Sequence, residues 1–351
     1  MDPQLRQRLQ RLPKAELHLH LEGTVQAATL WHLSQRHGYP FGLRDPEACA
    51  AVYAFQDFAG FLQAFKTVSQ HLRTPEDYGL AVLAMAHDLA AQGVVYAEVF
   101  ISLGILHWKQ MPVEPVWQAV QSASVQARLE TGVQLGWLFD AVRQFGPAAA
   151  EQVLHDCILR KADPSVLGIG LGGDEAGGPA AWFRETYREA ERAGLRRTVH
   201  AGESCGPESI WSAINDLRAE RIGHGLRATE DSRLMEHLSR GKVYLDVCPT
   251  SNVKTGCAAD LGGHPVSKFY KYNIPMSISS DDPAFFGANL LDELEMLHAV
   301  CGFSEDHLIK LLQSSFMGSF LPEAEKLLWL GKLRDAVRST APTLPPGGRR
   351  T

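Results

Sequence analysis

Eight short apolar runs, separated by helix-like stretches, constrain the fold of this chain more than any other feature of its sequence. Each run has four to eight residues, and all but Val94–Ile101 end in a small or polar residue. The runs are Ala15–His20, Val94–Ile101, Val133–Asp140, Val166–Gly172, Arg197–Ala201, Arg221–His224, Val243–Cys248 and Met276–Ser280. Apolar runs of this length that alternate with amphipathic segments predict βαβ units and a parallel sheet. Eight such units fit an α/β fold of the (β/α)8 barrel type.

The main alternative for such a pattern is an open, doubly wound sheet. The dinucleotide-binding form of that fold has a GxGxxG turn after its first strand, and no such turn follows the first run here. One gap also breaks the spacing, because more than seventy residues separate the first two runs. A single crossover helix needs far fewer residues. We therefore predict one barrel domain over residues 1–340 with an extra helical insertion after the first strand, followed by a flexible Pro- and Gly-rich tail over residues 341–351.

Aromatic residues recur inside this insertion at a helical spacing. Phe55, Phe58, Phe61, Leu62 and Phe65 are three or four residues apart, which predicts one apolar helix face. Such a helix can simply pack on the barrel, or it can act as a lid that places aromatic rings over a pocket at the strand ends. Amphipathic stretches farther along the chain predict outer helices over Ala180–Ala193 and Glu305–Phe316.

Composition excludes several classes of partner. The chain has 34 Lys and Arg against 40 Asp and Glu, a net charge of −6, so a basic surface for nucleic acid is not expected. No apolar run approaches the roughly 20 residues of a membrane span, and the N-terminus is too polar for a secretory signal. The six cysteines form no CxxC pair. We expect a cytoplasmic protein whose partner is a small molecule.

The candidate site residues stand where the predicted strands end, because that is where (β/α)8 barrels build their active sites. They are His18, His20, His200, Glu203, His224, Asp281 and Asp282. His18 and His20 are two residues apart in one strand, so both imidazoles can face the barrel interior. Buried imidazoles need partners for their ring nitrogens, and adjacent carboxylates repel one another unless a cation is near.

Three histidines and one aspartate form a nitrogen and oxygen donor set that suits zinc. Barrel hydrolases with two ions bridge them through a modified lysine on the fourth strand, and Val166–Glu175 contains no lysine. The zinc deaminases that act on nucleic acid carry a PCxxC segment, whereas Cys248 precedes Pro249 here and no second cysteine follows at that spacing. We therefore expect one metal ion.

The segments LPKAELHLHLEGT, GIGLGGDE, HAGES, RIGHG, CPTSN and ISSDDP occur in the order found in the adenosine deaminase family of metal-dependent amidohydrolases. The chain resembles that family from about Leu12 to Gly287. The resemblance implies a barrel with one catalytic Zn2+ and hydrolytic loss of ammonia from the 6-position of an adenine-type ring. By motif, it implies as metal ligands His18, His20, His200 and Asp281.

The same resemblance implies roles for the other strand-end residues. Glu203 matches the acid that serves ring N1, and His224 matches the histidine beside the attacking water. Asp282 and Gly173 match the contacts to purine N7 and N3. Zinc lowers the pKa of a bound water from about 15.7 towards 7. A protonated Glu203 would weaken the ring conjugation that protects C6, and this requires a pKa raised by burial.

Two positions bear on the choice of substrate. Adenosine deaminases usually have Asp after the second ligand histidine, where it contacts the ribose 5′-hydroxyl, and this chain has Glu22. Adenine deaminases of the family usually have a DSSE-like segment, where this chain has GGDE over 172–175. Together these features predict a nucleoside, in particular a 5′-substituted adenosine such as 6-amino-6-deoxyfutalosine. The alternatives are free adenine, another amino-heterocycle or cyclic amide, and a barrel that binds nucleosides without catalysis.

Overall fold

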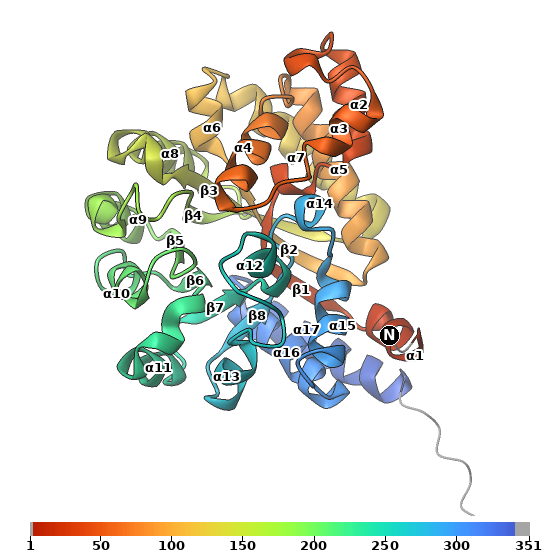
Figure 1. The fold of residues 1–351 in the computed structure, drawn as a ribbon, viewed down its shortest axis with the longest axis vertical. Coiled ribbons are helices and arrows are strands. Elements are labelled where there is room, and N and C mark those ends of the chain that lie inside the picture. Colours follow the sequence, from red (N-terminus) through yellow and green to blue (C-terminus); the bar gives the residue numbers. More distant parts are fainter. Residues whose placement is uncertain (1–2, 341–351) are drawn as a thin grey trace, which may run out of the picture.

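The computed structural model describes residues 3–340 as a barrel of eight parallel strands surrounded by helices (Figure 1). The strands are β1 (Lys14–His20), β2 (Val94–Ile101), β3 (Gln134–Val142), β4 (Val166–Gly172), β5 (Arg196–Ala201), β6 (Arg221–His224), β7 (Tyr244–Val247) and β8 (Met276–Ile278). Each predicted run agrees with one strand to within two residues at either end. The predicted (β/α)8 fold is confirmed.

The strands follow one another around the barrel in chain order. The barrel closes where the segment after β8 meets β1. The Asp281 N–H donates to the His18 carbonyl at 3.1 Å, and the His20 N–H donates to the Asp281 carbonyl at 3.0 Å. Closure excludes the open doubly wound sheet, and it also places an acidic residue directly between two histidines.

Helices cover the outside of the barrel and the end at which the strands finish, which is called the upper end below. They are α1 (Pro3–Arg11), α2 (Ala27–Arg36), α3 (Pro46–Ala51), α4 (Phe58–Ser69), α5 (Pro75–Ala91), α6 (Leu103–Trp108), α7 (Val113–Thr131), α8 (Pro147–Arg160), α9 (Arg184–Arg192), α10 (Pro207–Asn215), α11 (Ser232–Ser239), α12 (Pro249–Lys254), α13 (Val266–Lys271), α14 (Pro283–Phe286), α15 (Leu290–Ala299), α16 (Glu305–Gly318) and α17 (Glu323–Thr340). No helix within residues 3–340 is long and apolar enough to cross a membrane.

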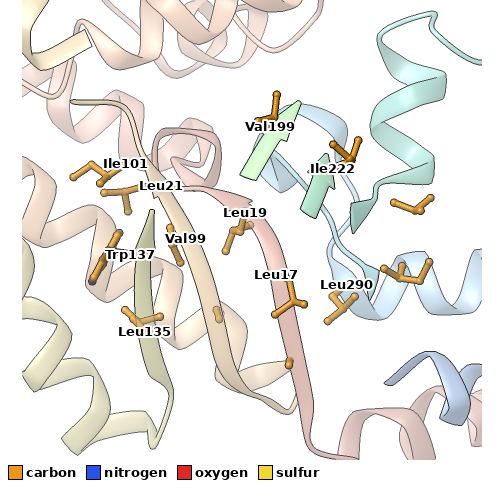
Figure 2. Packing of buried hydrophobic residues seen from close by; sticks show 14 of the residues in the cluster. Leu17, Leu19, Leu21, Val99, Ile101, Leu135, Trp137, Val199, Ile222 and Leu290 are labelled. Carbon is orange, nitrogen blue, oxygen red and sulfur yellow. The ribbon is translucent and has the colours of Figure 1, made fainter. Parts of the chain in front are cut away.

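Alternate residues of each strand belong to the hydrophobic core. Leu17 and Leu19 of β1 and Val99 and Ile101 of β2 are fully or almost fully buried members of one cluster (Figure 2). Side chains alternate between the two faces of a strand, so the intervening histidines of β1 point the other way, into the barrel. There the His18 ring lies 4.5 Å from the ring of His200 on β5, centroid to centroid.

The predicted insertion is present between β1 and β2, where α2, α3 and α4 precede the crossover helix α5. The aromatic face is shorter than predicted. Asp57 caps α4 by accepting from the Gly60 N–H at 2.8 Å, so the helix begins at Phe58. Phe55 stands before the helix, although its ring still packs 5.6 Å from that of Phe61.

Two predicted outer helices have different boundaries in the structure. Residues Ala180–Phe183 form a 3-10 turn, and α9 begins only at Arg184. Helix α16 continues to Gly318, two residues beyond the predicted end. The tail predicted over residues 341–351 lies outside the described residues.

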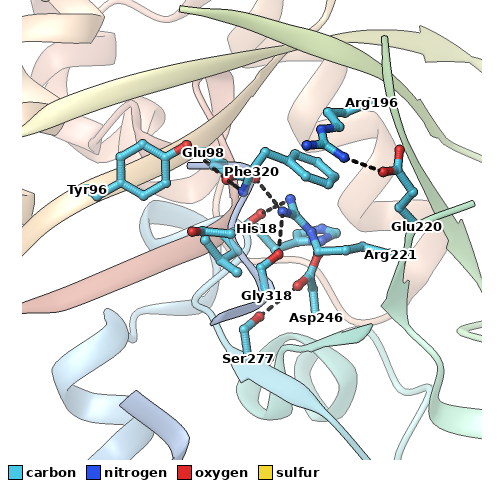
Figure 3. A network of polar contacts seen from close by, with 12 residues as sticks. His18, Tyr96, Glu98, Arg196, Glu220, Arg221, Asp246, Ser277, Gly318 and Phe320 are labelled. Atoms are coloured by element: carbon cyan, nitrogen blue, oxygen red, sulfur yellow. Dashed lines mark hydrogen bonds and ion pairs between the residues drawn. The ribbon is translucent and has the colours of Figure 1, made fainter. Parts of the chain in front are cut away.

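A buried ionic cluster fills the lower end of the barrel, where β6 begins, and is called the floor cluster below (Figure 3). Arg221 pairs with Glu98, and its Nε donates to Asp246 at 2.9 Å. Tyr96 donates to Glu98 at 2.9 Å, and Ser277 donates to Asp246 at 2.7 Å. Within the described chain, no nitrogen or oxygen atom of the arginine or its two acids is left without a partner.

Candidate metal and catalytic site

Four side chains converge at the upper end of the barrel. His18, His20, His200 and Asp281 each offer one ligand atom, and these atoms all lie within 4.8 Å of one another. The Nε2 atoms of His18 and His20 lie 3.3 and 3.4 Å from Asp281 Oδ1. The Nε2 atoms of His20 and His200 lie 3.1 Å apart. We call these four residues the donor cluster.

The hydrogen bonds around the donor cluster direct lone pairs towards its centre. His200 Nδ1 lies 3.2 Å from the Leu171 carbonyl, which can only accept, so Nδ1 carries the proton and Nε2 keeps a free lone pair. Neither ring nitrogen of His18 has a hydrogen-bond partner among the described residues. Ser251 donates to Asp281 Oδ2 at 2.7 Å. His200 and Asp281 each point one donor atom inward while the other is hydrogen-bonded to the protein, an arrangement that is typical of a metal site. The donor cluster fits a divalent cation.

A second set of possible ligands overlaps the first and was missed from the sequence. It consists of His224, Cys248 and Asp281. Cys248 stands at the end of β7, so the rule that strand ends supply the site would have found it. Burial raises the pKa of its thiol well above the ordinary value, which disfavours the thiolate that a metal needs. The four-residue donor cluster is the better candidate.

Two residues of the site have an unusual backbone conformation. His224 and Asp281 have φ angles of 66° and 65°, in the left-handed region that side chains other than glycine rarely adopt. Such strain costs about 1–3 kcal/mol per residue and is found mainly at functional sites. At both positions it occurs just where the chain leaves a strand and presents its side chain inside the barrel.

Glu203 is held by another carboxylate that the sequence analysis did not select. Glu175 accepts from the N–H groups of Gly202, Glu203 and Ser204 at 2.8, 2.8 and 2.9 Å. The Ser209 hydroxyl also donates to it. The loop after β5 is therefore fixed by the segment that follows the neighbouring strand β4. The sequence could have indicated this residue. Glu175 is the last residue of the GGDE segment, and no catalytic or binding role was predicted for it.

The environment of Glu203 favours a protonated carboxyl. The side chain is buried, and its Oε2 lies 3.6 Å from His224 Nε2. Burial raises the pKa of Glu203 well above its ordinary value, and the negative charge of Asp281 raises it further. Glu203 can therefore act as a proton donor near neutral pH.

A chain of hydrogen bonds defines the tautomer of His224. The Val266 N–H donates to His264 Nδ1 at 3.1 Å, so the proton of His264 is on Nε2, which lies 3.1 Å from Asn252 Oδ1. The amide nitrogen of Asn252 then donates to His224 Nδ1 at 3.1 Å. Burial lowers the pKa of His224 to about 3, so its ring is neutral and carries its single proton on Nε2, towards Glu203.

Asp282 and Gly173 both lie at the pocket beside the donor cluster. Asp282 Oδ1 is buried and has no hydrogen-bond partner among the described residues. A Cβ on Gly23 would lie 1.8 Å from that oxygen, which explains the glycine of the HLEG segment. Gly173 has a φ of 96°, and a Cβ there would lie 2.3 Å from Gln144 Oε1. Both observations explain why a glycine stands at this position of the pocket wall.

Glu22 does not reach the pocket directly. Its side chain is fully buried, and its Oε1 accepts from the Ser102 N–H at 3.1 Å. Ser102 lies on the pocket surface, whereas Glu22 is not among the described residues that line the pocket. The structure thus links Glu22 to the pocket through the start of α6.

The pocket beside the donor cluster is narrow, with a volume of about 70 Å3. Its walls combine the donor cluster and its polar neighbours with Phe58, Phe61, Leu62 and Phe65 of α4. The Phe65 ring lies 6.2 Å from the ring of His20. Helix α4 is therefore both a packed helix and the cover of the pocket, so the two interpretations of its aromatic face hold together.

Comparison with known proteins agrees with this geometry. The family model described as adenosine deaminase matches residues 13–337. The chain belongs to the adenosine deaminase family. Its relatives include the aminodeoxyfutalosine deaminase of Streptomyces avermitilis, which is 37% identical over 90% of this chain and 88% of that protein. The adenine deaminase of Cupriavidus metallidurans is 32% identical over 99% of this chain and 97% of that protein.

A solved structure within the family has the same fold. The adenine deaminase from Arthrobacter aurescens superposes with a TM-score of 0.88 at 32% identity, over 93% of this chain and 99% of that chain. As a member of the adenosine deaminase family, the protein is a hydrolase of the deaminase type that acts on aminopurines. This confirms the family and the class of enzyme expected from the sequence.

Proposed function

We propose that this protein is a zinc-dependent hydrolase that removes the 6-amino group of an adenosine-type nucleoside and releases the 6-oxo product and ammonia. The observation that carries the proposal is the convergence of the four-residue donor cluster with a buried Glu203 and a neutral His224. A barrel that binds nucleosides without catalysis would bury these groups at a cost and gain nothing from them.

In this proposal the donor cluster holds the metal. His18, His20, His200 and Asp281 supply three imidazole nitrogens and one carboxylate oxygen, a set that suits Zn2+. When bound, zinc lowers the pKa of a water molecule towards 7 and makes hydroxide available as the nucleophile. The remaining work falls to the protein side chains.

Glu203 acts as the general acid. Its protonated carboxyl donates to N1 of the purine ring, which draws electron density from C6 and weakens the conjugation that resists attack. Glu175 keeps the Glu203 backbone in place through three hydrogen bonds to consecutive N–H groups of that loop. Small errors in the position of an acid cost much of its catalytic effect.

His224 acts as a hydrogen-bond donor to the attacking oxygen. Its Nε2 carries the proton because Asn252 occupies Nδ1. A donor in this place stabilises negative charge on oxygen without itself becoming charged. Asp282 and the backbone of Gly173 contact N7 and N3 and hold the ring in its plane.

The proposed substrate is a nucleoside, and a 5′-substituted adenosine such as 6-amino-6-deoxyfutalosine is the preferred type. The GGDE segment and Glu22 support this choice, as does the relative from Streptomyces avermitilis. Glu22 would influence the 5′ side of the substrate through Ser102. Free adenine is the second candidate, and the relative from Cupriavidus metallidurans and the structure from Arthrobacter aurescens favour it.

A substrate panel tests the proposal. Adenine, adenosine and 6-amino-6-deoxyfutalosine are compared by ammonia release with purified, metal-loaded protein. We expect the largest kcat/KM for the 5′-substituted adenosine. A larger value for adenine would replace the proposed substrate with the second candidate, and no ammonia from any 6-aminopurine would contradict the proposed function.

A further inference from the structure

A large cavity lies between β1 and the outer helices α1, α5 and α15, and we call it the flank cavity. Arg6, Glu16, Asp88, Gln92 and Asp292 are among the residues that line it. Its volume is about 580 Å3, and small-molecule sites usually measure about 300–1,000 Å3. The flank cavity shares no lining residue with the catalytic pocket. It is therefore a separate space, to which the proposed reaction gives no role.

Two buried oxygen atoms in the wall of the flank cavity lack a hydrogen-bond donor. Glu16 is 0% exposed, and its Oε1 accepts from the N–H and the hydroxyl of Ser280 at 2.9 and 2.6 Å. Gln92 is 8% exposed, and its Nε2 donates to the Asp88 carbonyl at 2.9 Å. Glu16 Oε2 and Gln92 Oε1 have no partner among the described residues. A buried acceptor without a donor is costly, so the wall favours an occupant that donates hydrogen bonds.

The protein's own ammonium group beside this wall is already occupied. Lys14 precedes Glu16 by two residues on β1 and is fully buried. Its Nζ donates to the carbonyls of Leu9, Leu12 and Gln92. All three protons of a lysine ammonium are used in this way. Lys14 therefore leaves the free oxygen of Glu16 without a donor.

The charges around the flank cavity favour a cation. Arg6 is the one lysine or arginine among the described residues that line it, and it already pairs with Asp292, at 2.8 Å, and with Glu295. Asp88 is exposed, and within residues 3–340 no ion pair neutralises its carboxylate. The C-terminal end of α5 also lines the cavity, and the carbonyl end of a helix carries a partial negative charge. A positively charged occupant would compensate this excess.

An organic cation fits the flank cavity better than a metal ion. Among the described residues, no group of three or more possible metal ligands includes a residue of the cavity wall. The free acceptors are instead spread along the wall. Asp88 and Gln92 are four residues apart at the end of α5, a spacing at which side chains lie about 5–6 Å apart. Met85 and Leu89 supply apolar surface between the polar groups. This pattern suits a short carbon chain with an ammonium group at each end.

We infer that the flank cavity is a binding site for an organic cation with primary ammonium groups, of the size of a short aliphatic diamine. One ammonium group donates to Glu16 Oε2 and Gln92 Oε1, and the other pairs with Asp88. The carbon chain lies against Met85 and Leu89. The inference goes beyond the proposed function and does not depend on it.

Calorimetric titration of the metal-loaded protein with 1,4-diaminobutane tests the site, and 1,4-butanediol is the uncharged compound of the same length. We expect one diamine per chain, with a Kd at least about tenfold lower than that of the diol, because charge-assisted hydrogen bonds are the stronger ones. Both titrations are made at one ionic strength in KCl, so that general screening is the same in both. No saturable binding of the diamine, or equal Kd values for the two compounds, would overturn the site.

Two substitutions locate the bound diamine. Asp88→Asn removes an exposed charge and should raise Kd about threefold, as the loss of an exposed ion pair does. Glu16→Gln keeps an acceptor for Ser280 but places an amide donor against the ammonium group, and it should raise Kd at least about tenfold. Asp335→Asn is the matched control, because Asp335 is an aspartate on α17 whose side chain is 71% exposed. Its Kd should equal that of the original protein.

The exposed position of Asp88 keeps the test decisive if Glu16→Gln does not fold. A Kd that rises in Asp88→Asn and stays constant in Asp335→Asn supports the site. A Kd that Asp88→Asn leaves unchanged would mean that the diamine binds elsewhere, and it would overturn the site. Calorimetry measures binding alone, so these outcomes are independent of whether the protein deaminates any 6-aminopurine.

Discussion

The barrel contains two buried charged clusters, one at each end, and they differ in whether the protein neutralises its own charges. In the floor cluster Arg221 lies between Glu98 and Asp246, and every polar atom of the three has a partner among the described residues. In the donor cluster at the other end, neither ring nitrogen of His18 has a hydrogen-bond partner among the described residues, although Nε2 lies 3.3 Å from Asp281 Oδ1. The floor cluster is complete in the protein alone, whereas the donor cluster is arranged so that it could hold a metal ion.

This difference shows that one group of buried polar residues can stabilise the fold while another is kept for function. Breaking a buried ion pair by removing one partner is strongly destabilising, so the floor cluster should contribute to folding. A site that keeps unsatisfied lone pairs gives up some stability in exchange for binding an ion. The following predictions test this division, beginning with the largest effect.

Substitution of a donor-cluster residue should abolish both metal and activity. We expect His18→Ala and Asp281→Ala to contain less than about a tenth of the zinc of the original protein and to lose at least about 1,000-fold in kcat. Elemental analysis and ammonia release measure the two quantities. Active protein without any bound metal would show that the donor cluster is not a metal site.

Substitution in the floor cluster should lower the stability of the protein but leave its metal content unchanged. Glu98→Ala leaves the Arg221 guanidinium buried with one partner fewer, and we expect a loss of about 3–5 kcal/mol in the free energy of unfolding. Chemical denaturation of the metal-loaded protein measures this. The variant should keep its zinc in the folded state, and loss of zinc at unchanged stability would mean that the two clusters are not separate.

Glu203→Gln should lower kcat by at least about 100-fold, the usual contribution of a general acid. The pH dependence should change as well. Burial raises the pKa of Glu203, so the group is protonated and active at low and neutral pH, and kcat/KM falls as pH rises through that raised pKa. The alkaline fall should be absent in the Gln variant. Near-original turnover would remove the proton-donor role.

Asn252→Asp should have the smallest effect of the four. A carboxylate beside His224 Nδ1 can only accept, so it would draw the proton from Nε2 to Nδ1 and reverse the tautomer. Changes in residues that orient a site residue typically cost about 10- to 100-fold, and we expect kcat to fall by about tenfold with KM within about twofold. Nitrogen NMR of the His224 ring reports the tautomer directly. An unchanged spectrum would contradict the hydrogen-bond chain through His264.

Much of the site was predictable because it depends on strand ends. The histidines of β1 alternate with leucines, and this pattern alone predicts that they face the interior. The residues that were missed belong to a different class. Glu175, Asn252 and Cys248 are important for what they touch. Glu175 accepts from N–H groups 27 to 29 positions away, and Asn252 contacts His224 28 positions away in the chain.

The sequence by itself determined the eight strands, the inward histidines and the family, because each of these is encoded in local spacing or in short segments. The tertiary structure alone decided which side chains share partners. Closure of the barrel between β8 and β1 brings Asp281 between His18 and His20. Helix α4 packs over the strand ends and contributes Leu62 and Phe65 to the walls of both the narrow pocket and a larger cavity beside it. Hydrogen bonds and cavities depend on distances between segments that no local pattern specifies.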